Sequence, residues 1–287
     1  MRVALLGTGR MGAAMVRRLR IADVDLLIYN RTRETAESLA ARSGARTART
    51  AAEAVEEADV CLVSLADDAA VEATYAGPDG LVAGLRPGTV VCETSTVSPA
   101  TVRELSGKVS ERGATLLDCP VSGSVPLVER GELTVMVGGD EAALSRVRPV
   151  LDILATRVFR LGDVGAGAVM KLVVNSLVHS LNVSLSEAFV LAEKAGLDRE
   201  QVYDVFEASA VGAPFVRYKR AAFLDPAGTP VAFSLDLVAK DQTLIGGLAA
   251  DVDARMDQAE TNRRLVAEAV TAGLGQRDMS ALAVYLR

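Results

Sequence analysis

Tryptophan is absent from this chain of 287 residues, which has only six phenylalanines and five tyrosines. So few aromatic rings argue against a protein that stacks the bases of a nucleic acid. Basic residues are also in the minority, with 31 lysines and arginines against 37 aspartates and glutamates and a net charge of −6. A net acidic chain lacks the positive surface that binds a phosphate backbone. We therefore expect no nucleic-acid partner.

Metal ligands and paired cysteines are scarce as well. His179 is the only histidine, and the three cysteines are Cys61, Cys92 and Cys119. A structural zinc site needs about four clustered ligands, so we expect no metal. Each cysteine lies in or beside an apolar run and none forms a CxxC pair, which predicts buried, reduced thiols in a cytoplasmic protein.

Long uninterrupted hydrophobic segments are missing too. The N-terminus enters a short apolar strand and then a glycine-rich stretch, which is unlike a signal peptide. The charge-free stretch at residues 172–186 contains Asn175, His179 and Asn182, and it is too short and too polar to span a bilayer. We expect no membrane partner.

What the first 163 residues do have is a regular alternation of two patterns. Short apolar segments predict strands at residues 2–6, 25–29, 59–65, 89–92, 115–118 and 134–137. Helical spacing of apolar residues predicts helices at residues 11–20, 33–43, 99–112 and 141–155. Strands that alternate with helices are typical of βαβ units around a largely parallel sheet. Residues 1–163 are therefore expected to form a Rossmann-type α/β dinucleotide-binding domain.

The pattern changes at about Gly165, after which strand-like segments nearly vanish. Residues 168–195 keep helical spacing, which predicts a helix roughly 40 Å long at 1.5 Å per residue. Further helices are expected at residues 198–209, 235–250 and 259–272. We expect an all-helical second domain over residues 164–287, joined to the first by the long interdomain helix. Two domains also fit the chain length, at roughly 150 residues per domain.

A glycine-rich loop follows the first expected strand and precedes the first expected helix. It reads Gly7-Thr8-Gly9-Arg10-Met11-Gly12. A GxGxxG loop in this position binds a dinucleotide, because the backbone can approach the pyrophosphate closely and the helix N-terminus faces it. The alternative is an ordinary glycine-rich turn. We expect all six residues to contact the cofactor.

The second strand ends at Asn30-Arg31-Thr32, where an NAD-binding site usually has an acidic residue for the ribose 2′-hydroxyl. Asn30 would not repel a 2′-phosphate, and Arg31 can pair with one through two hydrogen bonds. Thr32 can add a hydroxyl. These residues favour NADP(H) over NAD(H), and the alternative for Arg31 is a solvated loop arginine.

Two more motifs directly follow expected strands, one over residues 93–99 and one over residues 118–124. Because ligands bind at the carboxyl ends of parallel strands, both motifs are candidates for the cofactor cleft. A third motif, over residues 165–175, opens the long helix and carries Lys171 and Asn175. Their i, i+4 spacing puts both side chains on one helix face.

Lys171 is unusual because its neighbours in the sequence are apolar. The chain has only five lysines, and arginine does not release its proton under ordinary conditions. A lysine among apolar residues suits proton transfer. The alternative is a structural lysine that extends from a helix start into solvent.

With these motifs the whole chain resembles the β-hydroxyacid dehydrogenases, a family that includes 3-hydroxyisobutyrate dehydrogenase. The resemblance rests on GTGRMGAAM, STVSP, DCPVSGS, GAGAVMKLVVN and FSLDLVAKD, in this order. It is nearest to the NADPH-dependent glyoxylate/succinic semialdehyde reductase branch. It implies interconversion of a small carboxylate-bearing aldehyde and its hydroxyacid, in a homodimer or homotetramer.

The resemblance also implies roles for individual residues. Lys171 would be the general acid/base, and Asn175 would orient Lys171 or the reacting oxygen. Contacts to the substrate are implied for Ser122, Gly123, Thr96, Phe233 and Asp241. Further contacts to the cofactor are implied for Leu65, Thr96 and Lys240. His179 lies two helical turns after Lys171 between apolar neighbours, so we expect a packing histidine with satisfied hydrogen bonds.

Two other functions remain open. Imine reductases share this fold and the use of NADPH, but they usually have Asp or Tyr where this chain has Lys171. A catalytically silent NADPH-binding protein on the same scaffold is the second alternative. Retention of Lys171, Asn175 and Lys240 argues against it.

Overall fold

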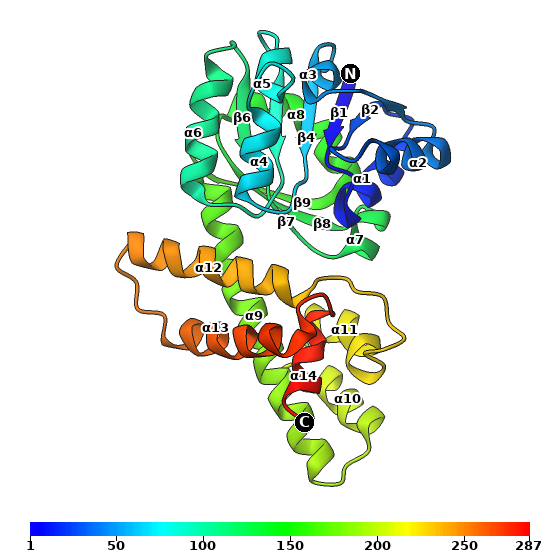
Figure 1. Cartoon of the computed structure of the whole chain (residues 1–287), viewed down its shortest axis with the longest axis vertical. Coiled ribbons are helices and arrows are strands. Elements are labelled where there is room, and N and C mark those ends of the chain that lie inside the picture. The colour runs from blue at the N-terminus through cyan, green and yellow to red at the C-terminus, as the bar shows by residue number, and fades with distance from the viewer. The chain divides into compact units, whose positions relative to one another are not determined.

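A computed structural model describes all residues 1–287 (Figure 1). The chain forms two compact units, Met1–Lys171 and Leu172–Arg287. The division falls inside helix α9 (Ala166–Lys194), a little after the boundary expected at residue 163. The first unit is an α/β unit and the second is helical, which confirms the expected fold class.

The first unit is built on one sheet with the strand order β3-β2-β1-β4-β5-β6-β8-β7, and β9 pairs with β8. Six strands are mutually parallel, and their order 3-2-1-4-5-6 is that of dinucleotide-binding folds. They are β1 (Arg2–Leu6), β2 (Asp25–Tyr29), β3 (Arg46–Thr47), β4 (Val60–Val63), β5 (Val90–Glu93) and β6 (Thr115–Asp118). The other strands are β7 (Val121–Ser122), β8 (Leu133–Gly138) and β9 (Ala155–Gly162). Strand β8 runs antiparallel to β6 and β7.

Helices cover both faces of this sheet, which explains why every residue of β4 and β5 is buried. The side chains of β1 alternate between the two faces, with Val3 and Leu5 in one core and Ala4 and Leu6 in the other. One face carries α1 (Arg10–Ile21), α2 (Arg33–Ser43), α7 (Val125–Arg130) and α8 (Glu141–Leu154). The other carries α3 (Ala51–Val55), α4 (Asp68–Tyr75), α5 (Leu81–Gly84) and α6 (Pro99–Ser110).

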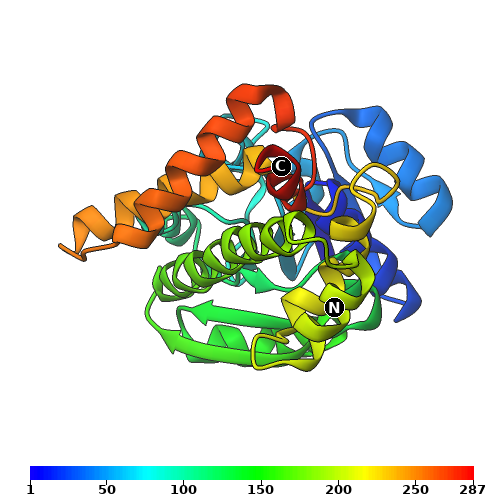
Figure 2. The ribbon, with the colours of Figure 1, turned by 90° about the horizontal axis from the view of Figure 1, so that it is seen from below.

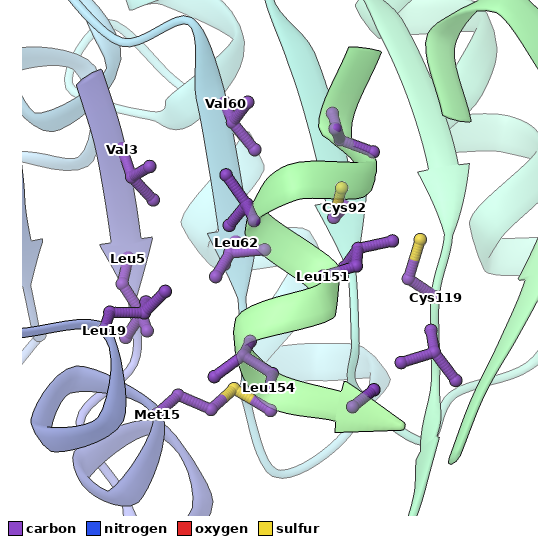
Figure 3. Close-up of a cluster of buried hydrophobic side chains, with 14 of the residues drawn as sticks. Val3, Leu5, Met15, Leu19, Val60, Leu62, Cys92, Cys119, Leu151 and Leu154 are labelled. Atoms are coloured by element: carbon purple, nitrogen blue, oxygen red, sulfur yellow. The ribbon is translucent and has the colours of Figure 1, made fainter. Parts of the chain in front are cut away.

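Figure 3 shows the first of these cores, where Leu151 and Leu154 of α8 lie over Leu62 and Cys92 of the central strands. Cys119 lies in the same core and Cys61 in the opposite one. All three cysteines are buried and free, which confirms the prediction of buried thiols.

Side-chain caps set the starts of several helices. Asp67 accepts a hydrogen bond from the Ala70 amide at α4, and Asp140 accepts one from the Ala143 amide at α8. Such caps satisfy N–H groups that have no partner within the helix.

The second unit contains the remainder of α9 and four further long helices. These are α10 (Arg199–Ala208), α11 (Pro214–Leu224), α12 (Leu235–Asp251) and α13 (Asp257–Ala269), and the short α14 (Leu282–Tyr285) ends the chain. Phe189, Tyr203 and Phe223 form its aromatic centre, with ring centroids 5.9 Å apart. Helices α12 and α13, joined by a short turn, lie side by side in both views (Figures 1 and 2).

Several elements were not predicted from the sequence. Strand β9 contains three exposed charged or polar positions between its apolar residues and lies at the sheet margin, so it lacks the alternation of a half-buried strand. Helix α11 has basic residues between its aromatic ones, which hid its apolar face. The other strands and α-helices missed are short: β3, β7, α3, α4, α5, α7 and α14.

The length and composition of helix α9 depart from the expectation that no segment could span a membrane. With 29 residues it is long and apolar enough to do so by length and composition alone. However, 39% of its most apolar window is buried inside the protein, and Asn175, His179 and Asn182 are among its buried residues. The core helix of a soluble protein passes the same test, so this is weak evidence for a membrane span.

Candidate active site

The ends of five neighbouring strands form one row across the sheet of the first unit. Tyr29, Leu6, Val63, Glu93 and Asp118 are successive partners in the register of β2, β1, β4, β5 and β6. Because these strands are parallel, the segments that follow them emerge at the same edge. The segments at this edge include all the residues of the first unit that the sequence assigned to the cofactor and substrate.

The glycine-rich loop leaves β1 between the ends of β2 and β4. Gly7 has φ +95°, and a Cβ at this position would collide with the carbonyl oxygen of Ser64. A Cβ on Gly12 would in turn collide with the carbonyl oxygen of Gly7. Glycine is therefore required at both positions for the loop to pass so close to β4 and to the first turn of α1.

The N-terminus of α1 is open to an anion. Its N-cap is Gly9, no side chain caps it, and its first turn has no acidic residue. The first N–H groups of the helix thus lack side-chain partners and carry the positive end of the helix dipole. The hydroxyl of Thr8 is buried without a hydrogen-bond partner. An uncapped helix start and an orphaned hydroxyl fit the pyrophosphate of a dinucleotide.

Asn30 connects this loop to the end of β2. Its Oδ1 accepts a hydrogen bond from the Thr8 amide at 3.1 Å, and its Nδ2 donates to the Thr32 carbonyl oxygen at 3.0 Å. Arg31 and Thr32 are exposed. The amide of Asn30 thus holds the backbone on both sides, and an aspartate would lose the bond to Thr32 because a carboxylate does not donate.

Glu93, which the sequence placed in a motif without giving it a role, links the ends of β4 and β5. Its carboxyl is buried and accepts hydrogen bonds from the Ser95 amide and the Tyr75 hydroxyl, both at 2.9 Å. The Ser95 Oγ accepts a further bond from the Leu65 amide at 2.8 Å. Glu93 therefore holds the segment that leads into Thr96, which is half-buried. Burial raises the pKa of Glu93 to about 7, although the bonds from Ser95 and Tyr75 oppose the rise.

This carboxyl makes the stability of the protein depend on pH. The folded state binds the Glu93 proton more tightly than the unfolded state does, so stability falls as pH rises from about 4.5 to about 7. The loss is about 3 kcal/mol and is complete above pH 7. Glu93→Gln can accept a hydrogen bond from Ser95 and donate one to Tyr75, and it should not show this loss of stability. Urea unfolding should be measured at about pH 5 and about pH 8. Between these two pH values, the free energy of unfolding of the variant should rise relative to that of the wild type by that amount.

The exposed Glu111 offers the matched control, since Glu111→Gln should follow the wild type at both pH values. A constant difference between Glu93→Gln and the wild type across this pH range would show that Glu93 is ionised in both states.

Asp118, at the end of β6, caps the helix that carries Lys171. Its two carboxylate oxygens accept hydrogen bonds from the amides of Gly165 at 2.8 Å and Ala168 at 2.7 Å. Burial raises the pKa of Asp118, and the backbone amides act against that rise. The cap fixes the first turn of α9 to the sheet, with Lys171 one turn beyond it.

Lys171 is half-buried, and its Nζ donates a hydrogen bond to the Val121 carbonyl oxygen at 2.8 Å. It therefore lies against β7, the strand that contains Ser122. Ser122 is half-buried, and Gly123 after it is exposed. The first unit thus brings Lys171 and the expected carboxylate-binding segment together.

The second unit holds the other expected site residues in one cluster, in which Asn175, His179 and Asp241 are buried and Phe233 and Lys240 are half-buried. Asp241 accepts a hydrogen bond from Asn175 Nδ2 at 2.6 Å, and Lys240 Nζ forms an ion pair with it at 2.9 Å. His179 Nε2 lies 3.3 Å from the same carboxylate, and the His179 ring stacks on Phe233 with centroids 6.1 Å apart. Burial would raise the pKa of Asp241, but His179 and the charge of Lys240 lower it to about 2.

Two expectations need qualification. His179 is buried as predicted, but only Nε2 has a partner, and Nδ1 is buried without one. The prediction of a fully satisfied histidine is therefore wrong. The amide nitrogen of Asn175 points to Asp241, so its bond to that carboxylate is a feature the sequence did not suggest.

Comparison with known families divides the chain into two parts, a few residues before the boundary between its two compact units. Residues 2–162 match the NAD binding domain of 6-phosphogluconate dehydrogenase. Residues 165–286 match a family described as NAD-binding of NADP-dependent 3-hydroxyisobutyrate dehydrogenase. Together the two matches cover nearly the whole chain.

Individual relatives agree with these matches. The chain is 32% identical over 285 residues to glyoxylate/succinic semialdehyde reductase 2, chloroplastic, of Arabidopsis thaliana, which covers 99% of this chain and 79% of that protein. It is 37% identical over 210 residues to the NAD-dependent L-serine dehydrogenase of Pseudomonas aeruginosa, covering 73% of this chain and 70% of that one. The crystal structure of 3-hydroxyisobutyrate dehydrogenase from Salmonella typhimurium has a TM-score of 0.90 at 28% identity and covers 99% of each chain.

Proposed function

Since the chain belongs to the β-hydroxyacid dehydrogenase family and is an oxidoreductase of that family, we propose that it is an NADP(H)-dependent enzyme for small carboxylate-bearing aldehydes. It would interconvert glyoxylate or a semialdehyde with the corresponding hydroxyacid. The observation that carries the proposal is the position of Lys171. This half-buried ammonium group is hydrogen-bonded to β7, next to Ser122 and beyond the carboxyl edge of a dinucleotide-binding sheet.

The residues at that edge suit the cofactor. The N-terminus of α1 and Thr8 would bind its pyrophosphate. Arg31 and Thr32 would bind its ribose. Leu65 and Thr96 would contact the part of the cofactor that leads to the nicotinamide. Arg10 and Met11 stand in the first turn of α1, and Lys240 is a further proposed cofactor contact. When bound, NADPH supplies the hydride for the aldehyde carbon.

The chain's own residues supply the proton and the orientation. As the aldehyde is reduced, its oxygen gains negative charge, which the Lys171 ammonium stabilises before it transfers a proton to that oxygen. In the reverse direction, a neutral Lys171 Nζ takes the proton of the hydroxyl group. Ser122 and the backbone at Gly123 would hold the substrate carboxylate, which keeps the reacting carbon fixed.

The preference for NADP(H) is supported by the end of β2. It has no carboxylate to repel a 2′-phosphate, and the exposed Arg31 guanidinium is able to pair with one. The family that matches the second domain is described by an NADP-dependent enzyme, 3-hydroxyisobutyrate dehydrogenase. One relative, in contrast, is named an NAD-dependent L-serine dehydrogenase. The preference between NADP(H) and NAD(H) must therefore be inferred from the residues of this chain.

Replacement of Arg31 tests that preference. Arg31→Ala should raise the KM for NADPH by about ten- to a hundredfold, the worth of a hydrogen bond to a charged group. The KM for NADH should change little, because NADH has no 2′-phosphate. Arg42→Ala, an exposed arginine on the helix that follows, is the control and should behave as the wild type. An equal rise of both KM values would assign Arg31 to something other than the 2′-phosphate.

The substrate class is tested with glyoxylate, succinic semialdehyde, tartronate semialdehyde, methylmalonate semialdehyde and a cyclic imine. The loss of reduced-nicotinamide absorbance is followed for each, with NADPH and with NADH. Turnover of one or more aldehydes with NADPH supports the proposal and ranks them. Turnover of the imine alone would make the protein an imine reductase, and tight NADPH binding with no turnover would favour a silent binding protein.

We also propose that the protein acts as a homodimer or homotetramer in the cytoplasm. Val173, Leu177 and Leu191 lie on one face of α9 and are exposed, Leu177 and Leu191 to about 70%. Exposed apolar side chains on one face of a long helix suit pairing with a second copy of the chain. The buried free thiols suit a reducing compartment.

A further inference from the structure

His179 has features that neither the proposed reaction nor simple packing explains. It is 3% exposed, and it lies two turns along α9 from Lys171. A residue that only filled space in the core of the second unit would need no polar atoms. His179 instead directs one ring nitrogen at a carboxylate and leaves the other buried without a partner. Keeping an imidazole in such a place has a free-energy cost that a hydrophobic side chain would avoid.

The carboxylate in question is Asp241, which is completely buried. Its charged form is retained inside the protein only because donors surround it: Asn175, His179 and Lys240. Asn175 and His179 stand one turn apart on α9, whereas Lys240 is adjacent to Asp241 on α12. Asp241 therefore ties the two helices together at the point where both present residues of the proposed site.

The hydrogen bond also fixes the state of the imidazole. A carboxylate only accepts hydrogen bonds, so the proton between the two groups belongs to His179 Nε2. The ring is further held by stacking on Phe233, at an interplanar angle of 29°. His179 thus contacts both Asp241 and Phe233, the two residues of the second unit that are expected to contact the substrate.

We propose that His179 is a positioning residue, which holds the Asp241 carboxylate and the Phe233 ring in the orientations that keep Asn175 and Lys240 in place. The expected effect of His179 on turnover rests on the proposed function. The contact between His179 and Asp241, however, can be tested without a substrate. His179 acts through Asp241 and Phe233 and takes no part in the proton transfer.

The single histidine makes a spectroscopic test unambiguous. In long-range ¹⁵N–¹H spectra of the uniformly labelled wild-type chain, every imidazole signal belongs to His179. The spectra should show a protonated Nε2, and Asp241→Asn should shift that signal. A ring protonated only at Nδ1, or a signal that Asp241→Asn leaves in place, would overturn the proposal.

Kinetics separate positioning from a merely structural role. His179→Leu should lower kcat/KM by about ten- to a hundredfold, because a charged group loses a donor. His179→Gln carries its amide nitrogen near the place of Nε2 and should restore most of the activity, whereas the shorter His179→Asn should not. Asn182→Leu is the control: Asn182 is equally buried on α9 and donates to the Met279 carbonyl oxygen at 3.0 Å, outside the cluster. It should lower stability without lowering kcat/KM.

Calorimetric titration with NADPH makes the failure of this proposal distinct from a failure of the proposed function. If the wild type reduces no aldehyde, the proposed function fails, and the comparison is made on NADPH affinity, which should fall in His179→Leu and recover in His179→Gln. Equal activity and NADPH affinity in the wild type and His179→Leu would reject a positioning role, even with the expected spectra.

Discussion

Replacing Lys171 with alanine is expected to lower kcat by about 10²- to 10⁴-fold, the usual contribution of a general acid or base. The aldehyde oxygen would lose both the positive charge that stabilises it and the proton that it receives. NADPH affinity should change little, because the lysine lies beside β7 and the residues proposed to bind the phosphates lie between β1 and α1 and at the start of α1. Steady-state kinetics and NADPH titration separate the two effects.

Two further substitutions sharpen this result. Lys171→Arg keeps the positive charge but cannot release a proton, so it should remain nearly inactive. Lys194→Ala removes an exposed lysine at the other end of the same helix and should leave kcat unchanged. If Lys171→Arg keeps most of the activity, charge alone is sufficient. If Lys171→Ala is active to within a few fold, the assignment of the general acid/base is wrong.

The second large effect concerns a buried ion pair in the second unit, Lys219 with Asp278. Lys219 Nζ lies 2.7 and 2.8 Å from the two carboxylate oxygens, and both side chains are almost completely buried. Asp278 also accepts hydrogen bonds from the amides of Ala232, Phe233 and Ser280. It thus fixes the segment that contains Phe233 to the end of the chain.

Asp278→Ala should destabilise the second unit by about 3–5 kcal/mol, because it leaves a buried ammonium and three amides without partners. Lys219→Met should cost less, since the three amides still stabilise the carboxylate. Hydrogen–deuterium exchange followed by mass spectrometry should show faster exchange in α11 and α12 and unchanged exchange in the first unit.

An exposed pair provides the comparison. Arg148 and Asp152 of α8 are 2.6 Å apart at about half exposure, and Arg148→Ala should cost no more than about 1 kcal/mol. If Lys219→Met costs more than Asp278→Ala, the amide bonds to Asp278 contribute less than the structure indicates.

The parts of the fold and site that the sequence predicted depend on neighbours in the chain. The glycine loop needs only the strand before it and the helix after it, and Lys171 stood out because its immediate neighbours are apolar. The ends of the parallel strands could be aligned because parallel topology fixes them at one edge. The proposed cofactor-binding residues were predicted in this way.

The contacts that were missed join residues far apart in the sequence. Asp118 caps a helix start 47 residues later, and His179 meets Asp241 62 residues away. Periodicity and motifs carry no information about which polar residues meet across such separations. Glu93 had a visible signal, a carboxyl at the end of a fully apolar strand, but only the structure shows that it holds Tyr75 and Ser95.

In the proposed reaction, hydride passes from NADPH to the carbon of a carboxylate-bearing aldehyde. The most direct measurement uses NADPH deuterated at the transferable position of the nicotinamide ring, the wild-type protein and glyoxylate or a semialdehyde, with products identified by mass spectrometry. We expect a hydroxyacid that carries deuterium on the former aldehyde carbon, and almost none of this product with Lys171→Ala. An aldehyde that is recovered unchanged while a cyclic imine yields a deuterated amine would contradict it.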